Sequence, residues 1–227
     1  MAPTTRMCIT VIDQSTGAAT ELVEESKQVD IDAWEALRFR VTELSAGAKV
    51  MVASGSLTPG APQDFYAWCA RQANELKIPA VVDASGEPLQ KSLASRPFVV
   101  KPNRGELAKT LGVSIESDAA LRDAVKRLID LGPRWAIITE GKAGAIVSDG
   151  TKFWRVRSPQ VKTVNAIGSG DALAGGLATA IARNQPMPDA CKLAVACGAA
   201  NAMSLYSGVI RPDDVWNLLT QVELEDD

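Results

Sequence analysis

Short apolar runs alternate with longer segments of helical periodicity from residue 49 onward, and this alternation restricts the folds open to the chain. The run KVMVAS (49–54) is apolar and β-branched, whereas 62–77 repeats apolar residues at helical spacing. Further strand-like runs lie at 80–85, 98–103 and 135–141. Near-continuous apolar strands that alternate with helices are typical of parallel sheets covered on both faces. The sequence therefore predicts an α/β fold, a mostly parallel sheet with helices on both faces.

The two ends of the chain complete the predicted order of elements. Residues 144–156 predict a hairpin that turns at Asp149 and Gly150. The remainder predicts three helices and a solvated acidic tail, at 171–183, 188–206, 212–222 and 223–227. The first 48 residues predict a hairpin and then a helix, 30–44, whose inward-facing residues are Trp34, Leu37, Val41 and Leu44. A length of 227 residues suits a single domain, 1–227.

The composition excludes several classes of function. The chain has no histidine, so acid–base chemistry must fall to carboxylates, Lys, Tyr or Cys, and His-based triads and metal sites are excluded. Its net charge of −3 gives no overall attraction for nucleic acid or for anionic membranes. The four cysteines form no C-x-x-C pair, which favours reduced thiols over zinc or disulfide sites. Because no apolar run is long enough for a membrane span or signal peptide, we expect a cytoplasmic protein.

The stretch VNAIGSGDALAGG (164–176) places glycines and an acid at the start of a predicted helix. A helix N-terminus presents free N–H groups to an anion, and Gly168 and Gly170 let the backbone approach that anion closely. Asp171 lies beside this anion site, where a carboxylate can orient a hydroxyl and accept its proton. The combination fits phosphoryl transfer. The alternative is a glycine turn in which Asp171 only complements the helix dipole.

Taken together, several motifs resemble the ribokinase-like carbohydrate kinases of the pfkB family, and most closely its tagatose-6-phosphate kinase and 1-phosphofructokinase branch. The resemblance rests on NAIGSGDALAGG, ASGSLTPG, VVKPNRGELAKTLG, ITEGKAGAIVSDG and CGAANAMSLYSGVI, which occur in the order that the family has. It implies a ribokinase-like α/β fold. It also implies that the N-terminal third of the family, with its first strands and much of the lid, is missing.

By this resemblance, the catalytic residues are Asp171 as base and the backbone from Ile167 to Gly170 as an anion hole, which includes Gly168 and Ser169. In the N-x-x-E motif, Asn103 and Glu106 would organise Mg²⁺ through its waters, which agrees with the preference of Mg²⁺ for few protein ligands. A capping box between the same two residues is the structural alternative.

The resemblance also assigns the nucleotide side of the site. The loop with Thr139, Gly141 and Gly144 would support the phosphates and ribose of ATP, and Lys101 would reach the phosphates. Residues near the adenine would be Thr163, Ala199 and Asn201. The alternatives are a solvated lysine at 101, plain packing at 163 and 199, and a core-facing amide at 201.

On the sugar side, the resemblance implies that Arg6, Ser54, Gly55 and Ser56 grip the phosphate of the substrate. Arginine suits this task because its guanidinium binds phosphate in a bidentate manner. For Arg6 the alternative is a solvated side chain near the chain end.

The expected function is ATP-dependent phosphorylation of a ketohexose phosphate, either tagatose 6-phosphate or fructose 1- or 6-phosphate. The rival is a truncated homologue that binds adenine nucleotide without turning over sugar, and a longer natural protein is also left open. The missing strands predict an exposed sheet edge. The expected partners are the sugar phosphate and ATP, with Mg²⁺, and a homodimer is left open.

Overall fold

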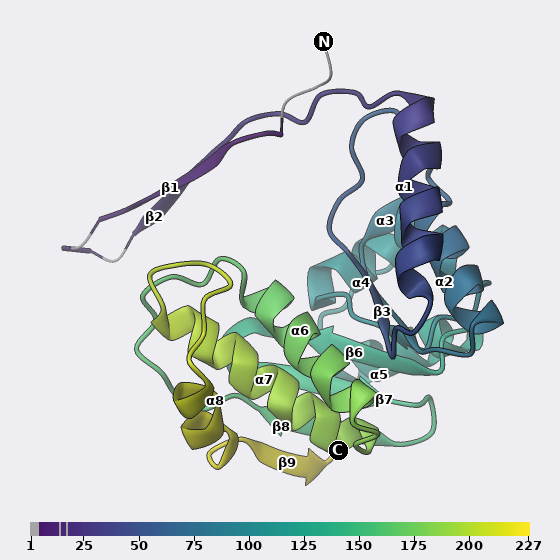
Figure 1. The fold of residues 1–227 in the computed structure, drawn as a ribbon. Helices are drawn as coiled ribbons and strands as arrows, with labels where there is room; N and C mark the ends of the chain where they lie inside the picture. The colour runs from purple at the N-terminus through teal and green to yellow at the C-terminus, as the bar shows by residue number, and fades with distance from the viewer. Residues whose placement is uncertain (1–4, 14, 17) are drawn as a thin grey trace.

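The structure, a computed structural model, describes residues 5–13, 15–16 and 18–227 (Figure 1). Its main sheet has seven strands in sequence order, β3 (Met51–Ser54), β4 (Ala80–Asp83), β5 (Val99–Val100), β6 (Trp135–Thr139), β7 (Gly144–Ser148), β8 (Phe153–Arg157) and β9 (Glu223–Asp226). The pairs from β3 to β6 are parallel, and those from β6 to β9 are antiparallel. The parallel half contains the strand ends that form the site.

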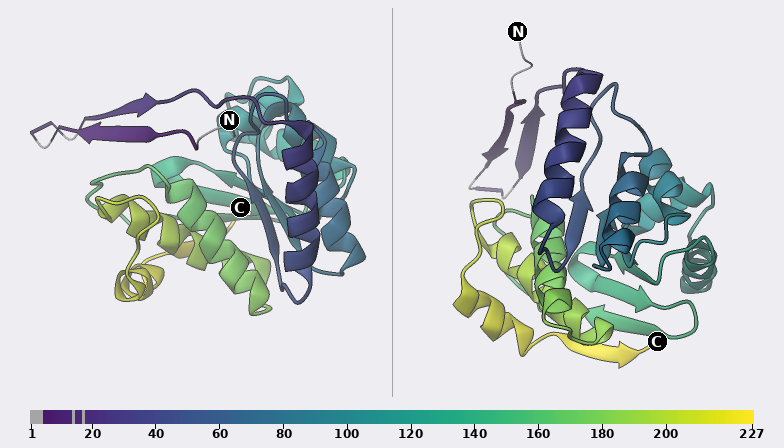
Figure 2. Two further views of the ribbon diagram at one scale, coloured as in Figure 1. Left: turned by 45° about the horizontal axis from the view of Figure 1, so that its top comes forward. Right: turned by 45° about the vertical axis from the view of Figure 1, so that its right-hand side comes forward.

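Helices cover both faces of this sheet, as the sequence predicts (Figure 2). They are α1 (Ile31–Ser45), α2 (Phe65–Glu75), α3 (Gly86–Leu93), α4 (Arg104–Leu111), α5 (Asp118–Asp130), α6 (Ser169–Ala182), α7 (Met187–Met203) and α8 (Pro212–Leu219), with a short 3₁₀ turn, η1 (Gly141–Ala143). Among the described residues, none of these helices is both long and apolar enough to cross a membrane.

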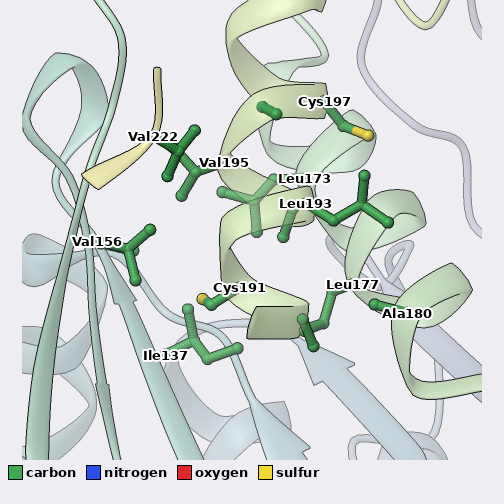
Figure 3. Close-up of a cluster of buried hydrophobic side chains, with 14 of the residues drawn as sticks. Ile137, Val156, Leu173, Leu177, Ala180, Cys191, Leu193, Val195, Cys197 and Val222 are labelled. Carbon is green, nitrogen blue, oxygen red and sulfur yellow. The ribbon is translucent and has the colours of Figure 1, made fainter. Parts of the chain in front are cut away.

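Strand alternation divides the core into two layers. Val81 and Ile137 pack with α6, α7 and α8 on one face, whereas Val82 and Ile138 pack with α2 to α5 on the other. Successive side chains of a strand point to opposite faces, so a strand buried on both faces is apolar throughout. Figure 3 shows part of the first layer, a buried cluster that includes Leu173 and Leu177 of α6 and Cys191 and Val195 of α7.

One prediction about the N-terminal helix is wrong, and one about the C-terminal tail is incomplete. Leu37 and Leu44 are 42% and 69% exposed rather than inward-facing, because they lie along an apolar groove beside β3, whose outer edge pairs with no strand among the described residues. The acidic tail is exposed as predicted, but it forms a strand, β9, which pairs with β8 and places Leu224 opposite Val156.

The predicted N-terminal hairpin is present as β1 (Cys8–Ile12) and β2 (Ala19–Val23). It extends away from the body of the molecule, as Figures 1 and 2 show, and its side chains are almost all exposed. Arg6 immediately precedes this hairpin and is exposed as well.

The small residues of α6 allow it to pack closely against α7. A Cβ on Gly176 would lie 2.8 Å from Cys197 Sγ and 3.1 Å from Ala194 Cα, whereas a Cβ on Gly175 would have no neighbour within 4 Å. The requirement for small residues therefore comes from the neighbouring helix rather than from the sheet.

We expect Gly176→Ala to lower the free energy of unfolding by about 1–3 kcal/mol through overpacking against α7. Gly175→Ala, one residue earlier on the exposed side of the same helix, should raise it by about 0.5–1 kcal/mol, since alanine loses less backbone entropy on folding. Denaturant midpoints of the two variants test this, and equal effects would contradict the packing described for α6 and α7.

Candidate active site

The N-terminus of α6 adopts the conformation that an anion site needs. Gly168 is the N-cap residue with φ of 79°, in the left-handed region, and a Cβ there would lie 2.0 Å from Ser207 Oγ. Any other residue would be strained by the backbone and blocked by this contact. The glycine at this position therefore sets the direction in which the helix begins.

The free amides at this turn are fewer than the sequence suggests. Ile167 N donates to Asn165 Oδ1 (3.0 Å) and Ser169 N donates to the carbonyl of Ala166 (3.2 Å). Within the predicted range, Ile167 to Gly170, the amides of Gly168 and Gly170 therefore remain, and Asp171 adds a third. Among the described residues, none of these three amides donates a hydrogen bond to an acceptor. These three amides are the donors available to an anion.

The side chain of Asn201 binds this turn through hydrogen bonds from the core side. Its Nδ2 donates to the carbonyl of Ile167 (2.8 Å) and to Ser169 Oγ (3.1 Å), while its Oδ1 accepts from Gly208 N (2.7 Å). The side chain is fully buried and does not line the cavity expected to hold the adenine. The core-facing amide is thus observed, while the position of Asn201 near the adenine stays a prediction, since it bonds Ser169 in the lining of that cavity.

A first cavity, of about 270 Å³, opens beside this turn. Residues predicted for the nucleotide site line it together with the turn itself: Thr139, Gly141, Gly144, Thr163, Ala199, Ser169 and Gly170. Its wall is fixed at Gly144, where a Cβ would lie 1.9 Å from the carbonyl oxygen of Val156. The structure thus brings five of the predicted nucleotide residues to one cavity, and Asn201 and Lys101 lie outside its lining.

A second cavity, of about 420 Å³, lies on the other side of the same helix end and is more polar. The predicted substrate residues 54–56 line it, together with the carboxylates of Asp83, Glu106 and Asp171. Arg6 does not line it. Because Gly170 lines the first cavity and Asp171 the second, the first turn of α6 stands between the two.

Lys101 is a buried partner of Asp83 rather than a solvated side chain. Its Nζ lies 3.0 Å from Asp83 Oδ2, and only 4% of the residue is exposed. Burial raises the pKa of Asp83 above its ordinary value, and the charge of Lys101 opposes that rise. A Cβ on Gly170 would lie 3.9 Å from the same Nζ, so this ammonium group is close to the anion site.

Asp83 was missed in the sequence, although a signal for it exists. An acid at the carboxyl end of the buried strand AVVD lies where ligands bind in parallel sheets. Ser54 ends the neighbouring strand in register with it, and Ser54 Oγ lies 3.3 Å from both Asp83 Oδ2 and Asp171 Oδ1. Parallel pairing of β3 and β4 thus brings these groups together.

Tyr66 is a second group that sequence reasoning missed. Its hydroxyl lies 2.9 Å from the carbonyl oxygen of Gly55 and 3.1 Å from that of Ser54, and can donate to either. Burial raises the pKa of Tyr66 to about 12, so the hydroxyl keeps its proton and remains a donor. This contact fixes the loop of residues 54–56 against α2.

Asn103 and Glu106 form the capping box at the start of α4. Glu106 N donates to Asn103 Oδ1 (2.9 Å), and Asn103 N donates to Glu106 Oε2 (2.8 Å). Among the described residues there is no group of three or more His, Cys, Asp or Glu side chains arranged to hold a metal ion. The carboxylate of Glu106 nevertheless lines the second cavity, and Mg²⁺ needs only one or two such carboxylates because it keeps several waters. The donor set therefore fits Mg²⁺ held through water.

Comparisons of the sequence and of the fold with known proteins all match this chain to carbohydrate kinases. Residues 3–213 match the family described as pfkB family carbohydrate kinase. A tagatose-6-phosphate kinase of Staphylococcus epidermidis is 33% identical over 223 residues, which cover 97% of this chain and 71% of that relative. Phosphofructokinase-2 of Escherichia coli in complex with potassium matches with a TM-score of 0.86 at 25% identity, covering 94% of this chain and 70% of that one.

A second structure of the same Escherichia coli enzyme, in complex with fructose-6-phosphate, has a TM-score of 0.82 at 26% identity, covering 94% of this chain and 69% of that one. These likenesses confirm the ribokinase-like α/β fold and a kinase as the class of enzyme. The chain therefore belongs to the pfkB family of carbohydrate kinases.

Proposed function

We propose that this chain transfers the γ-phosphoryl group of ATP to a hydroxyl group of a ketohexose phosphate, namely tagatose 6-phosphate, fructose 6-phosphate or fructose 1-phosphate. The observation that carries the proposal is the position of the first turn of α6, which contributes Gly170 to one cavity and Asp171 to the other. Transfer between two bound molecules needs an anion site and a base at such a boundary. The tagatose-6-phosphate kinase and the fructose-6-phosphate complex among the matches support the substrate class.

In this proposal, Asp171 is the base. The sugar hydroxyl oxygen forms a bond to the γ-phosphorus while the bond from that phosphorus to the bridging oxygen of ADP breaks, and the hydroxyl proton passes to the Asp171 carboxylate. The free amides of Gly168 and Gly170 donate hydrogen bonds to the group in transfer. The Lys101 ammonium, close to Gly170, adds positive charge on the same side.

Mg²⁺, when bound, would neutralise charge on the phosphates. Glu106 and Asn103 are the residues proposed to hold its waters. The position of the Glu106 carboxylate in the lining of the second cavity supports this role. The capping box orients that carboxylate, since one of its oxygens is already bonded to the backbone of Asn103.

A nucleotide-binding protein that does not phosphorylate sugar is the second candidate. The observation that favours it concerns Arg6, which was expected to bind the substrate phosphate but is exposed beside the hairpin and does not line the second cavity. The first cavity has its full set of lining residues without Arg6, so nucleotide binding would persist.

ADP release in the presence of Mg²⁺-ATP, measured with each of the three sugar phosphates in turn, distinguishes the two candidates. We expect release that depends on at least one of them, and calorimetric binding of ADP without any sugar. Binding of ADP with no sugar-dependent release would favour the second candidate. Failure to bind ADP would contradict both.

A further inference from the structure

A cluster of partly buried charged side chains lies next in the chain to residues of the nucleotide cavity and is separate from the groups assigned above. Glu140 Oε1 accepts from Arg104 Nη1 and Glu140 Oε2 accepts from Arg155 Nη1, each at 3.2 Å. We call these residues the Arg104–Glu140–Arg155 triad. The side chains of Glu140 and Arg155 are 12% and 16% exposed and are largely removed from water, whereas that of Arg104 is 33% exposed.

The triad is balanced by two further carboxylates at its solvent side. Arg155 Nη2 lies 3.2 Å from Asp118 Oδ2 and 3.5 Å from Asp227 Oδ2, and Arg104 Nη2 lies 3.7 Å from Asp118 Oδ1. Neither oxygen of Glu140 is shared with these outer pairs. Asp118 also contacts both arginines, but its side chain is 64% exposed, so the less exposed carboxylate that joins them is that of Glu140.

The position of the triad in the chain relates it to both halves of the site. Arg104 lies inside the N-x-x-E segment, between Asn103 and Glu106, and Glu140 lies between Thr139 and Gly141, which line the nucleotide cavity. We call residues 139–144 the nucleotide loop. Its backbone is linked to the N-x-x-E segment by an isolated bridge between Asn103 and Thr139 and by Thr139 N, which donates to the carbonyl of Pro102 (3.2 Å). The ion pair of Glu140 with Arg104 adds a side-chain link between the nucleotide loop and the segment proposed for Mg²⁺.

Arg155 fixes the same loop to β8. Glu140 N donates to the carbonyl of Gly144 (2.8 Å), which closes the loop, and Gly144 already packs against the carbonyl of Val156. Removing either arginine would leave the loop with a single side-chain anchor. Buried ion pairs add little net stability compared with apolar packing, but they can select one conformation.

We propose that Glu140 is a positioning residue, which through Arg104 and Arg155 sets the nucleotide loop relative to the N-x-x-E segment without contacting substrate. The proposal rests on the proposed function only in placing nucleotide in the first cavity. Because Glu140 lies on the nucleotide side, its loss should change the affinity for nucleotide and not that for the sugar phosphate.

Glu140→Asp is the decisive variant because it keeps the charge but shortens the side chain. The carboxylate at position 140 then no longer reaches both arginines. We expect the Kd for ADP, measured by calorimetry, and the KM for ATP to rise about tenfold, the equivalent of one charge-assisted hydrogen bond. The KM for the sugar phosphate should stay within about twofold. Glu140→Gln should also weaken ADP binding, although removal of a negative charge alone would strengthen it.

Arg157→Gln is the matched control. Arg157 lies two residues along β8 from Arg155 and pairs with Glu225 (2.9 Å), but both side chains are well exposed, so ADP affinity should not change. If Arg104→Gln is combined with Glu140→Gln, the Kd for ADP should be no higher than in Glu140→Gln alone, since the two residues act as a unit.

Unchanged ADP affinity in Glu140→Asp, with or without a lower Tm, would overturn the proposal, as would an equal rise in the KM for both substrates. Should either Glu140 variant fail to fold, Arg104→Lys, which keeps the charge but loses the fork geometry, takes its place with the same expected rise in the Kd for ADP. Wild-type protein that does not bind ADP would instead contradict the proposed function, so the two failures are distinguishable.

Discussion

Replacement of Asp171 with Asn is expected to lower kcat by about 10²–10⁴-fold, the usual contribution of a general base. The amide has nearly the same shape as the carboxylate but cannot accept the hydroxyl proton. Because Asp171 lines the second cavity and not the first, the Kd for ADP should be unchanged within about twofold. Steady-state kinetics with the preferred sugar phosphate, together with ADP calorimetry, test this result.

Asp189→Asn is the matched control for this variant. Asp189 is an exposed acid in the first turn of α7, so it shares residue type and helical position with Asp171 but lines neither cavity. Its kcat should equal that of the wild type. Comparable activity of Asp171→Asn and wild type would show that another group takes the proton.

Lys101→Met is the second change with a large expected effect. Methionine has a similar length, but its thioether leaves Asp83 without its buried counter-charge, and breaking such a pair costs about 3–5 kcal/mol of unfolding free energy. Loss of the ammonium near Gly170 should also lower kcat. Denaturant unfolding measures the first effect. Lys109→Met, at an exposed position in the last turn of α4, is the control and should leave both quantities unchanged.

The pH dependence of the unfolding free energy shows whether Lys101→Met loses stability through the uncompensated charge of Asp83. Burial already raises the pKa of Asp83, and without Lys101 it should rise further. A carboxyl group whose pKa is higher in the folded than in the unfolded state binds more protons when folded, so stability falls as the pH rises through that interval. The deficit of Lys101→Met should therefore shrink as the pH is lowered toward the ordinary Asp value of 3.8.

Comparing unfolding at pH 5 and pH 8 checks this expectation. Asp83→Asn in the Lys101→Met background should recover part of the lost stability at pH 8, because the uncompensated charge is removed. A deficit that is the same at both pH values, and that Asp83→Asn does not relieve, would assign the loss to packing rather than to the ion pair.

Much of the fold could be predicted because its main signals are local. Apolar strands at 80–83 and 135–139 and the helices between and after them follow from hydrophobic period alone. The differences at Leu44 and in the tail have one physical cause. Periodicity shows which face of a segment is apolar but not whether a partner covers it, and among the described residues no strand pairs with the outer edge of β3 beside Leu44. The tail lacked an apolar pattern, yet β8 offered it an edge to pair with.

The site was predictable where a motif carries its own chemistry and less so where long-range contacts decide. The glycines and acid of the α6 turn and the capping box of Asn103 were visible from spacing. The pairing of Lys101 with Asp83 depends on the order of two parallel strands. The role of Asn201 depends on two backbone groups and a serine hydroxyl, which come from the turn at the start of α6 and from the loop after α7. No single segment encodes such contacts.

A crystal structure with Mg²⁺ and a non-hydrolysable ATP analogue would show whether the first turn of α6 binds the terminal phosphate. We expect adenine and ribose in the cavity lined by Thr163 and Ala199, with the terminal phosphate within hydrogen-bond distance of the Gly168 and Gly170 amides and facing Asp171. A nucleotide bound elsewhere, or a terminal phosphate turned away from these amides, would contradict it.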